Sequence, residues 1–221
     1  MNFPRTTVGG ISLPRMLIGC NWISGFSHRG AAGDTMIRKA HRDPASTAAI
    51  FQTFMNSGVD AVLGLIGVDA NLSKAVKMAE DATGKQMIIV DTLVLNMDDT
   101  AMARHEAELE IKASAARGAT FCLPLHSSVE QLINKNTETM DRLPDYLRMI
   151  RDAGMIPGLS AHMPEVIQYP DKNDYDVETY IQPYNCMGFM MQVEIESVSK
   201  IIHAARKPVI TIKPCAAGRT T

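Results

Sequence analysis

Short apolar runs that alternate with helical stretches predict an α/β fold with a parallel sheet for this chain of 221 residues. Most of the runs lack the polar alternation of a half-exposed strand, as expected for strands that helices cover on both faces. The G-x-G-x-x-G motif of dinucleotide-binding doubly wound sheets does not follow the first run. Together these observations favour a TIM (β/α)8 barrel.

Seven apolar runs are the predicted strands. In chain order they are Met16–Cys20, Ala61–Leu65, Met87–Val90, Thr120–Leu125, Met155–Ser160, Thr179–Gln182 and Val209–Ile212. Helices are predicted between them at Pro44–Asn56, Asp99–Ala116, Thr139–Ala153 and Gln192–Ala205. Asp43 is the expected N-cap of the first helix, and Gly118 and Gly154 follow the ends of the second and third.

The eighth βα unit of a complete barrel is missing from this pattern. The sequence ends at CAAGRTT, shortly after the seventh apolar run. Because no linker or change of composition divides the chain, we expect a single domain over residues 1–221. We favour the interpretation that this chain is a shortened form of a longer barrel protein.

Charge and cysteine content exclude several classes of protein. There are 22 Lys and Arg residues against 24 Asp and Glu residues, a net charge of −2 that does not favour a nucleic-acid partner. No apolar run approaches the roughly 18 residues of a membrane span, and the N-terminus lacks the apolar region of a signal peptide. The four cysteines form no C-x-x-C pair. We therefore expect a soluble cytoplasmic protein with reduced, mostly buried thiols and no membrane partner.

Six segments, taken in chain order, carry a family resemblance. They are VGGISLPRMLIGCNWISG (8–25), DPASTAAIFQTFMNSGVDAV (43–62), FCLPLHSS (121–128), GMIPGLSAH (154–162), YIQPYN (180–185) and IKPCAAGR (212–219). In this order they resemble segments of the aldo-keto reductases. The resemblance implies a barrel with an N-terminal hairpin at about residues 6–15 and strands one to seven at about residues 16–213.

The resemblance extends to only one of the family's four catalytic residues. His126 matches the catalytic histidine. Leu63 or Gly64 stands where the family has an Asp, Asp91 or Thr92 stands where it has a Lys, and the segment LIGVDAN has no counterpart of the catalytic Tyr. Because that Tyr donates the proton and the Lys lowers its pKa, we expect carbonyl reduction by this route to be lost.

A nicotinamide cofactor nevertheless stays open. Ser160, Gln182 and Asn185 match the family positions that contact the nicotinamide, although Gln182 stands one residue closer to the Tyr-Asn pair than usual. The family's dinucleotide phosphate site is built largely after the eighth strand, which lies outside this sequence. The resemblance therefore leaves NADP(H) as one candidate cofactor.

Polar residues at the predicted strand ends suggest a different chemistry. Asp91, His126 and His162 follow three consecutive strands, whose carboxyl ends carry the active site in TIM barrels. Two imidazoles and a carboxylate are ligands that Zn²⁺, Mn²⁺ and Fe²⁺ accept, so a divalent metal is the other candidate cofactor. The alternatives are a metal-free acid–base site around His126 and strand-end histidines that only bond to neighbouring backbone.

Basic residues supply further candidates. Lys213 ends the seventh strand and either forms a Schiff base with a carbonyl substrate, binds an anion, or pairs with a carboxylate such as Asp91. Arg29, Arg38 and Arg42 lie in a segment after the first strand and are candidates to clamp an anionic substrate.

Three functions stay open on these residues. The first is a small-molecule enzyme with acid–base, metal-free or metal-assisted chemistry on a carbonyl or sugar-like substrate, in which His126, Asp91 and Lys213 are the catalytic groups. The second is an NADP-dependent oxidoreductase of the aldo-keto reductase type. The third is a barrel that only binds or regulates a partner. We expect a cluster of methionines, Met187, Met190 and Met191, to belong to the core or to the interface of a homo-oligomer; an adaptable binding surface is the alternative.

Overall fold

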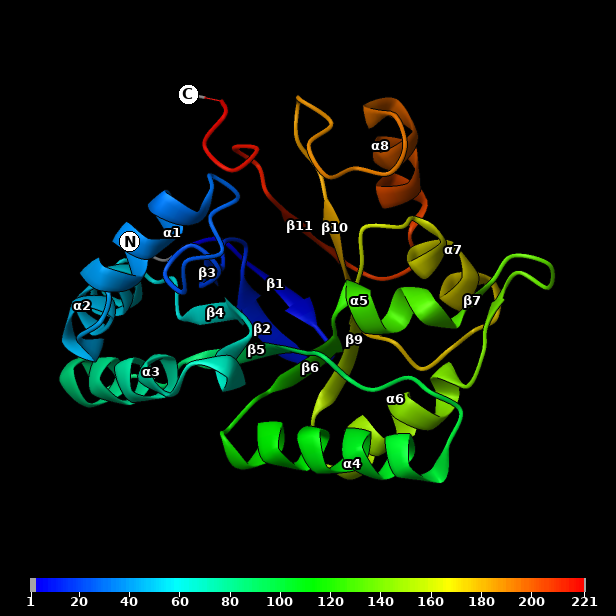
Figure 1. Ribbon diagram of the computed structural model, residues 1–221, viewed down its shortest axis with the longest axis horizontal. Helices are drawn as coiled ribbons and strands as arrows, with labels where there is room; N and C mark the ends of the chain where they lie inside the picture. The colour runs from blue at the N-terminus through cyan, green and yellow to red at the C-terminus, as the bar shows by residue number, and fades with distance from the viewer. Residues whose placement is uncertain (1–2, 221) are drawn as a thin grey trace. The chain divides into compact units, whose positions relative to one another are not determined.

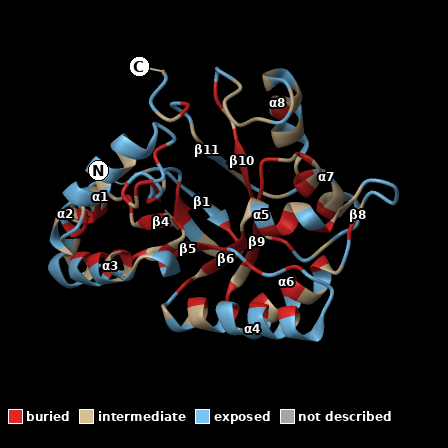
Figure 2. Cartoon of the chain, viewed as in Figure 1, coloured by how far each residue is buried: buried red, intermediate tan, exposed pale blue. Residues whose placement is uncertain are grey.

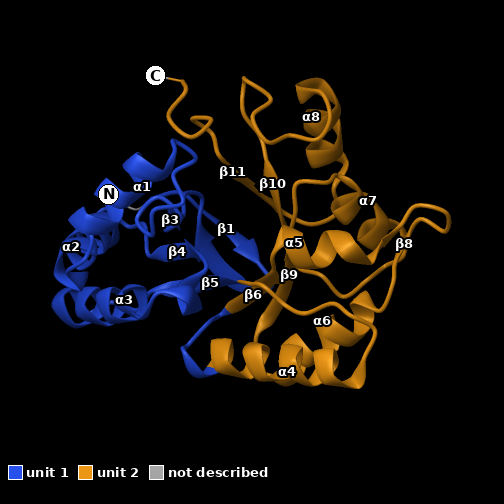
Figure 3. Cartoon of the chain, in the orientation of Figure 1, with its two compact units in different colours: residues 1–92, 116–120 blue, residues 93–115, 121–221 orange. Residues whose placement is uncertain are grey.

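All seven predicted strands are present in the computed structural model, which describes residues 3–220 (Figure 1). The chain divides into two compact units, coloured separately in Figure 3. Unit 1 comprises residues 3–92 and 116–120, and unit 2 comprises residues 93–115 and 121–220. The expectation of a single domain stays a prediction.

Unit 1 begins with the expected hairpin. Strands β1 (Arg5–Val8) and β2 (Ile11–Pro14) pair antiparallel, and the turn between them consists of Gly9 and Gly10 at φ 53° and 82°. A tight hairpin turn needs positive φ at both central residues, which glycine adopts without strain. Three strands then pair in parallel: β3 (Ile18–Gly19), β4 (Ala61–Gly64) and β5 (Ile88–Leu93).

The helices of unit 1 are α1 (Ala31–Ala40), α2 (Pro44–Asn56) and α3 (Ala70–Thr83), with a short 3-10 turn η1 (Ile66–Val68) before α3. Asp43 accepts the backbone N–H of Ala45 at 2.9 Å, so the predicted N-cap of α2 is confirmed. Helices α2 and α3 pack side by side and bury Phe51 and Leu72.

Four parallel strands form the sheet of unit 2, in the order β6 (Phe121–Pro124), β9 (Ile156–Ser160), β10 (Thr179–Pro183) and β11 (Val209–Ile212). Every residue of β6 and β10 is buried, and the buried colour of Figure 2 follows both strands. This burial explains why these strands are apolar without alternation.

The helices of unit 2 are α4 (Ala101–Ala116), α5 (His126–Val129), α6 (Leu143–Asp152), α7 (Glu165–Lys172) and α8 (Ile195–Ala204). A 3-10 turn η2 (Glu130–Leu132) extends α5 and leads into a small antiparallel hairpin of β7 (Ile133–Asn134) and β8 (Thr139–Met140). Helix α6 has an apolar face, with Leu143, Leu147 and Ile150 buried.

The predicted helix Thr139–Ala153 is wrong over its first residues. Thr139 and Met140 pair with the preceding strand in the β7–β8 hairpin, and Arg142 has a left-handed φ of 60°. The helix therefore starts only at Leu143. Helices α3, α5 and α7 were not predicted, although the apolar residues of α3 recur at helical spacing.

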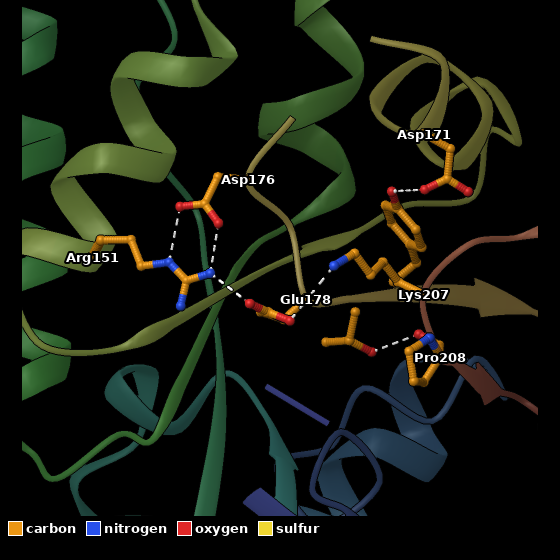
Figure 4. Close-up of polar contacts among 8 residues, drawn as sticks. Arg151, Asp171, Asp176, Glu178, Lys207 and Pro208 are labelled. Atoms are coloured by element: carbon orange, nitrogen blue, oxygen red, sulfur yellow. Dashed lines mark hydrogen bonds and ion pairs between the residues drawn. The ribbon is translucent and has the colours of Figure 1, made fainter. Parts of the chain in front are cut away.

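A polar network ties together elements of unit 2 (Figure 4). Arg151 of α6 donates two hydrogen bonds to the carboxylate of Asp176, at 2.9 and 2.6 Å, and a third to Glu178 at 2.7 Å. Glu178 precedes β10 and also lies 3.8 Å from the ammonium of Lys207. Asp171 of α7 accepts the hydroxyl of Tyr180 at 2.6 Å, which joins α7 to β10.

Within residues 3–220, no helix has both the length and the apolar composition that crossing a bilayer requires.

Candidate active site

Three of the predicted site residues come together in unit 2. His126 is the first residue of α5, directly after β6 and Leu125, His162 follows the end of β9, and Lys213 follows β11. The strands are parallel, so their carboxyl ends lie along one edge of the sheet. That arrangement brings together side chains that are far apart in sequence.

The ring of His162 lies between the other two groups. Its centroid is 4.4 Å from the centroid of the His126 ring, and the two planes are stacked at 20°. Its Nε2 atom is 3.3 Å from the Nζ atom of Lys213. Two imidazoles and an amine therefore form a contiguous chain of groups that can accept or donate protons.

Backbone hydrogen bonds fix the position of His162. Glu130 of η2 accepts the backbone N–H groups of His162 and Met163 at 2.7 and 3.0 Å, through one carboxylate oxygen. Gln182 of β10 donates its side-chain amide to the carbonyl of His162 at 3.0 Å. Glu130 was not among the predicted residues, because its role depends on the backbone N–H groups of another strand end, which no local sequence pattern contains.

Burial differs among the three groups. His162 is only 7% exposed, whereas His126 and Lys213 are half-buried and thus in contact with solvent. Burial lowers the pKa of Lys213 below its ordinary value, because desolvation disfavours the charged ammonium. No nearby carboxylate of unit 2 counteracts this effect among the described residues. At a given pH, a larger fraction of the Lys213 amine is therefore neutral than at an exposed lysine.

The two histidines and Glu130 also form a group whose potential ligand atoms lie within 4.8 Å of one another. Ligand atoms around a tetrahedral Zn²⁺ are about 3.3 Å apart, and an imidazole binds metal in its own plane. Because the stacked rings lie in nearly parallel planes, one ring must turn before both can contact the same ion. The predicted metal site had Asp91 as its carboxylate and stays a prediction. The group with Glu130 was not predicted, and the geometry of its two histidines is that of a stacked pair.

Asp91 lies in unit 1, where it is fully buried in β5. Its carboxylate accepts the backbone N–H of Ile66 at 3.0 Å and lies 3.3 Å from the guanidinium of Arg117. Arg117 was not predicted as its partner. The guanidinium of Arg117 therefore balances the charge of Asp91 within unit 1. The catalytic and metal-binding roles of Asp91 stay predictions.

The predicted nicotinamide-binding residues are all buried in unit 2. Asn185 holds the loop that follows β10: its side chain accepts the N–H of Met187 and of Phe189 and donates to the carbonyl of Phe189. Gln182 is different, because the oxygen of its side-chain amide is buried and has no hydrogen-bond partner among residues 3–220. Ser160 lies at the end of β9. A ligand donor group would satisfy the Gln182 oxygen.

The basic candidates of unit 1 are exposed. Arg29 precedes α1, Arg38 lies near its end, and Arg42 follows it. Arg38 donates to Thr35 and to the carbonyl of Gly25, both at 3.4 Å. The role of these residues in clamping an anion stays a prediction.

Two of the three comparisons with known proteins found nothing: no protein-family model and no curated protein matches this sequence. Among solved structures, the chain is similar to a protein from Pseudomonas aeruginosa whose assignment as an aldo-keto reductase is itself provisional. The TM-score is 0.63 at 11% sequence identity, over 94% of this chain and 76% of the other. The chain has a TIM-barrel-type fold.

The comparison confirms the predicted fold class and the resemblance in fold to an aldo-keto reductase. A sugar phosphate isomerase/epimerase from Parabacteroides distasonis also matches, with a TM-score of 0.47 and 13% identity, over 88% of this chain and 89% of the other. In the described residues, three parallel strands belong to unit 1 and four to unit 2, and no eighth is present.

Proposed function

We propose that the chain is a small-molecule enzyme that moves protons on a carbonyl or sugar-like substrate. The observation that carries the proposal is the contact of the His162 ring with both the His126 ring and the Lys213 amine. Such a cluster at the carboxyl ends of parallel strands occupies the place where TIM-barrel enzymes do their chemistry. A histidine is also the side chain best suited to acid–base work near neutral pH.

In the proposed reaction His126 is the acid–base group. One of its ring nitrogens takes a proton from the carbon next to the substrate carbonyl, which leaves an enediolate. Lys213 stabilises the charge that develops on the carbonyl oxygen. His162 supports both groups through its stacked ring and its contact with the amine. Return of the proton to the neighbouring carbon isomerises the substrate, and return to the same carbon exchanges its hydrogen with solvent.

Hydrogen exchange tests this proposal without knowledge of the natural substrate. The incorporation of deuterium from D₂O into dihydroxyacetone and glyceraldehyde is followed by NMR, with wild type and with His126→Asn. We expect the variant to lose about 100-fold or more of the exchange rate, the range that a general base contributes. His203→Asn is the matched control, because His203 is an exposed histidine of α8 in the same unit. Equal exchange rates in wild type and His126→Asn contradict the proposal.

A nicotinamide-dependent oxidoreductase is the second candidate, favoured by the unpartnered oxygen of Gln182. The amide NH₂ of a nicotinamide is a donor that such an oxygen accepts. A calorimetric titration of the chain with NADPH tests this candidate. Binding that weakens about fivefold in Gln182→Leu supports it, since a hydrogen bond contributes roughly 1 kcal/mol. Absence of binding removes it.

Two further alternatives have readouts of their own. If the site holds a divalent ion, elemental analysis should find near-stoichiometric metal, and a chelator should lower the rate of hydrogen exchange. A barrel that only binds a partner predicts no exchange in wild type and unchanged partner binding in His126→Ala.

A further inference from the structure

Lys213 differs in its surroundings from three other lysines of unit 2. Lys135 lies 2.7 Å from Glu165, Lys207 lies 3.8 Å from Glu178, and Lys172 pairs with Glu138. Lys213 has instead an imidazole nitrogen 3.3 Å from its Nζ atom. Its surroundings therefore contain a proton acceptor in place of a counter-charge.

The protonation state follows from these surroundings. The carboxylate of Glu165 raises the pKa of Lys135, which keeps that amine charged. Burial acts in the opposite direction on Lys213 and lowers its pKa. A neutral amine is a nucleophile, whereas an ammonium is not. Desolvation of a lysine near a group that can take up its proton is one way in which proteins activate lysine for attack on a carbonyl.

We propose that Lys213 is a covalent nucleophile that forms an imine with the carbonyl carbon of an α-hydroxy aldehyde or ketone. The proposal rests on the proposed function and deepens it, because it names the substrate class and replaces a charge contact by a covalent bond. It assigns to His162 the proton transfers that imine formation requires.

The chemistry balances as follows. The Nζ atom of Lys213 adds to the carbonyl carbon, and the new N–C bond forms as the C=O double bond becomes a single bond. Nε2 of neutral His162, with its other ring nitrogen protonated, takes the proton that the amine loses. The alkoxide oxygen takes one proton from solvent and becomes a hydroxyl. The proton held by His162 then goes to that hydroxyl oxygen, which leaves as water when the C=N bond forms as a protonated imine. The protonated imine then draws electrons from the adjacent C–H bond, whose proton His126 removes.

This covalent role differs from a purely electrostatic one in a measurable way. A lysine that only stabilises negative charge acts as a cation, and arginine can replace it in part. A lysine that forms an imine leaves a reducible C=N bond. Borohydride converts that bond to a stable secondary amine, which mass spectrometry assigns to one residue.

The experiment traps the imine on the intact chain at neutral pH. Wild type is incubated with dihydroxyacetone or glyceraldehyde, treated with borohydride and digested for peptide mass analysis. We expect the reduced adduct at Lys213 above the level found at Lys200, since the imidazole beside the Lys213 amine can take up its proton. Lys200 is the matched control because it is an exposed lysine of α8. Lys213→Arg removes the adduct and leaves the labelling of Lys200 unchanged.

The outcomes separate this inference from the proposed function. Selective labelling of Lys213 by either of these α-hydroxy carbonyl compounds supports the imine, whether or not hydrogen exchange is seen. Hydrogen exchange without an adduct at Lys213 above the level of Lys200 overturns the imine and leaves the proposed acid–base function standing. Absence of both exchange and selective labelling overturns both.

Discussion

Cys20 of unit 1 is 1% exposed, and burial together with the neighbouring charge of Asp91 raises the pKa of its thiol to about 12. Its Sγ atom donates to the carbonyl of Leu63 at 3.3 Å. The thiolate is the reactive form of cysteine, so this thiol is inert at neutral pH. The expectation of mostly buried thiols holds for Cys20 and Cys122, whereas Cys186 and Cys215 are exposed.

Thiol titration tests whether the buried and the exposed cysteines differ in reactivity. With a chromogenic disulfide reagent at pH 8, we expect two thiols per chain to react quickly and the other two only after the addition of denaturant. Replacement of both Cys186 and Cys215 by Ser removes the fast phase. A third fast thiol in wild type would show that burial does not protect Cys20 or Cys122.

Lys213 gives a prediction about stability and pH. Its pKa is lower in the folded chain than in the unfolded chain, where it is about 10.4. Between the two values the unfolded state binds more protons, so stability rises with pH across this window, and below it the buried charge opposes folding fully. We expect Lys213→Met to raise the melting temperature at pH 7 and to lose this advantage as pH approaches 10.4.

Lys200→Met is the control for that measurement, because an exposed side chain changes stability by less than about 0.5 kcal/mol. A melting temperature that falls at pH 7 in Lys213→Met, with Lys200→Met unchanged, would mean that the charged amine stabilises the fold.

At the scale of elements, apolar runs are the part of the sequence that predicts the structure best. Strands such as β6 and β10 are buried along their whole length, so continuous apolar character is their physical requirement. The β7–β8 hairpin was missed because its two-residue strands and polar turn leave no periodic signal. The stacking of His126 on His162 depends on strand pairing, which no local pattern contains.

Gly158 in β9 marks a close approach between neighbouring strands. A Cβ atom at this position would lie 2.7 Å from the Leu123 side chain in β6 and 2.9 Å from the backbone carbonyl of Thr179 in β10. We expect Gly158→Ala to lower the free energy of unfolding by about 1–3 kcal/mol through overpacking. Gly19→Ala is the control, since a Cβ atom there has nothing within 4 Å. Equal destabilisation of the two variants in urea would contradict the account.

The ion network of Arg151 links α6 to the segment before β10 (Figure 4). Because its bidentate contact with Asp176 is favourable geometry for a partly exposed pair, we expect Arg151→Met to cost about 1 kcal/mol in urea unfolding at pH 7. Arg148→Met should cost less, since Arg148 contacts only Asp145 on the surface of α6. A larger loss in Arg148→Met would refute this ranking.

The stabilisation by the Arg151–Asp176 pair should decrease in acid. The hydrogen bonds from Arg151 lower the pKa of Asp176 in the folded chain. The stabilisation is therefore complete above the unfolded value of about 3.9 and disappears as pH falls through the lower folded value. The difference between wild type and Arg151→Met should shrink in acid accordingly.

At the scale of the whole chain, the sequence predicted the fold class, and the similarity to a solved structure with a TM-score of 0.63 confirms it. The candidate site was predicted in part. His126, His162 and Lys213 could be selected because each follows a recognisable strand. Glu130 could not, since its role depends on the backbone N–H groups of another strand end. Nor could the pairing of Asp91 with Arg117, which the apolar pattern around both residues does not reveal.

The central claim is that the cluster of two histidines and a lysine in unit 2 is a reactive centre and not only a packed strand edge. The most direct measurement is the rate of deuterium incorporation into dihydroxyacetone at neutral pH, for wild type, His126→Asn and His203→Asn. The account predicts exchange in wild type and in His203→Asn, with a loss of about 100-fold or more in His126→Asn. Exchange that is absent from wild type, or that persists at the same rate in His126→Asn, would contradict it.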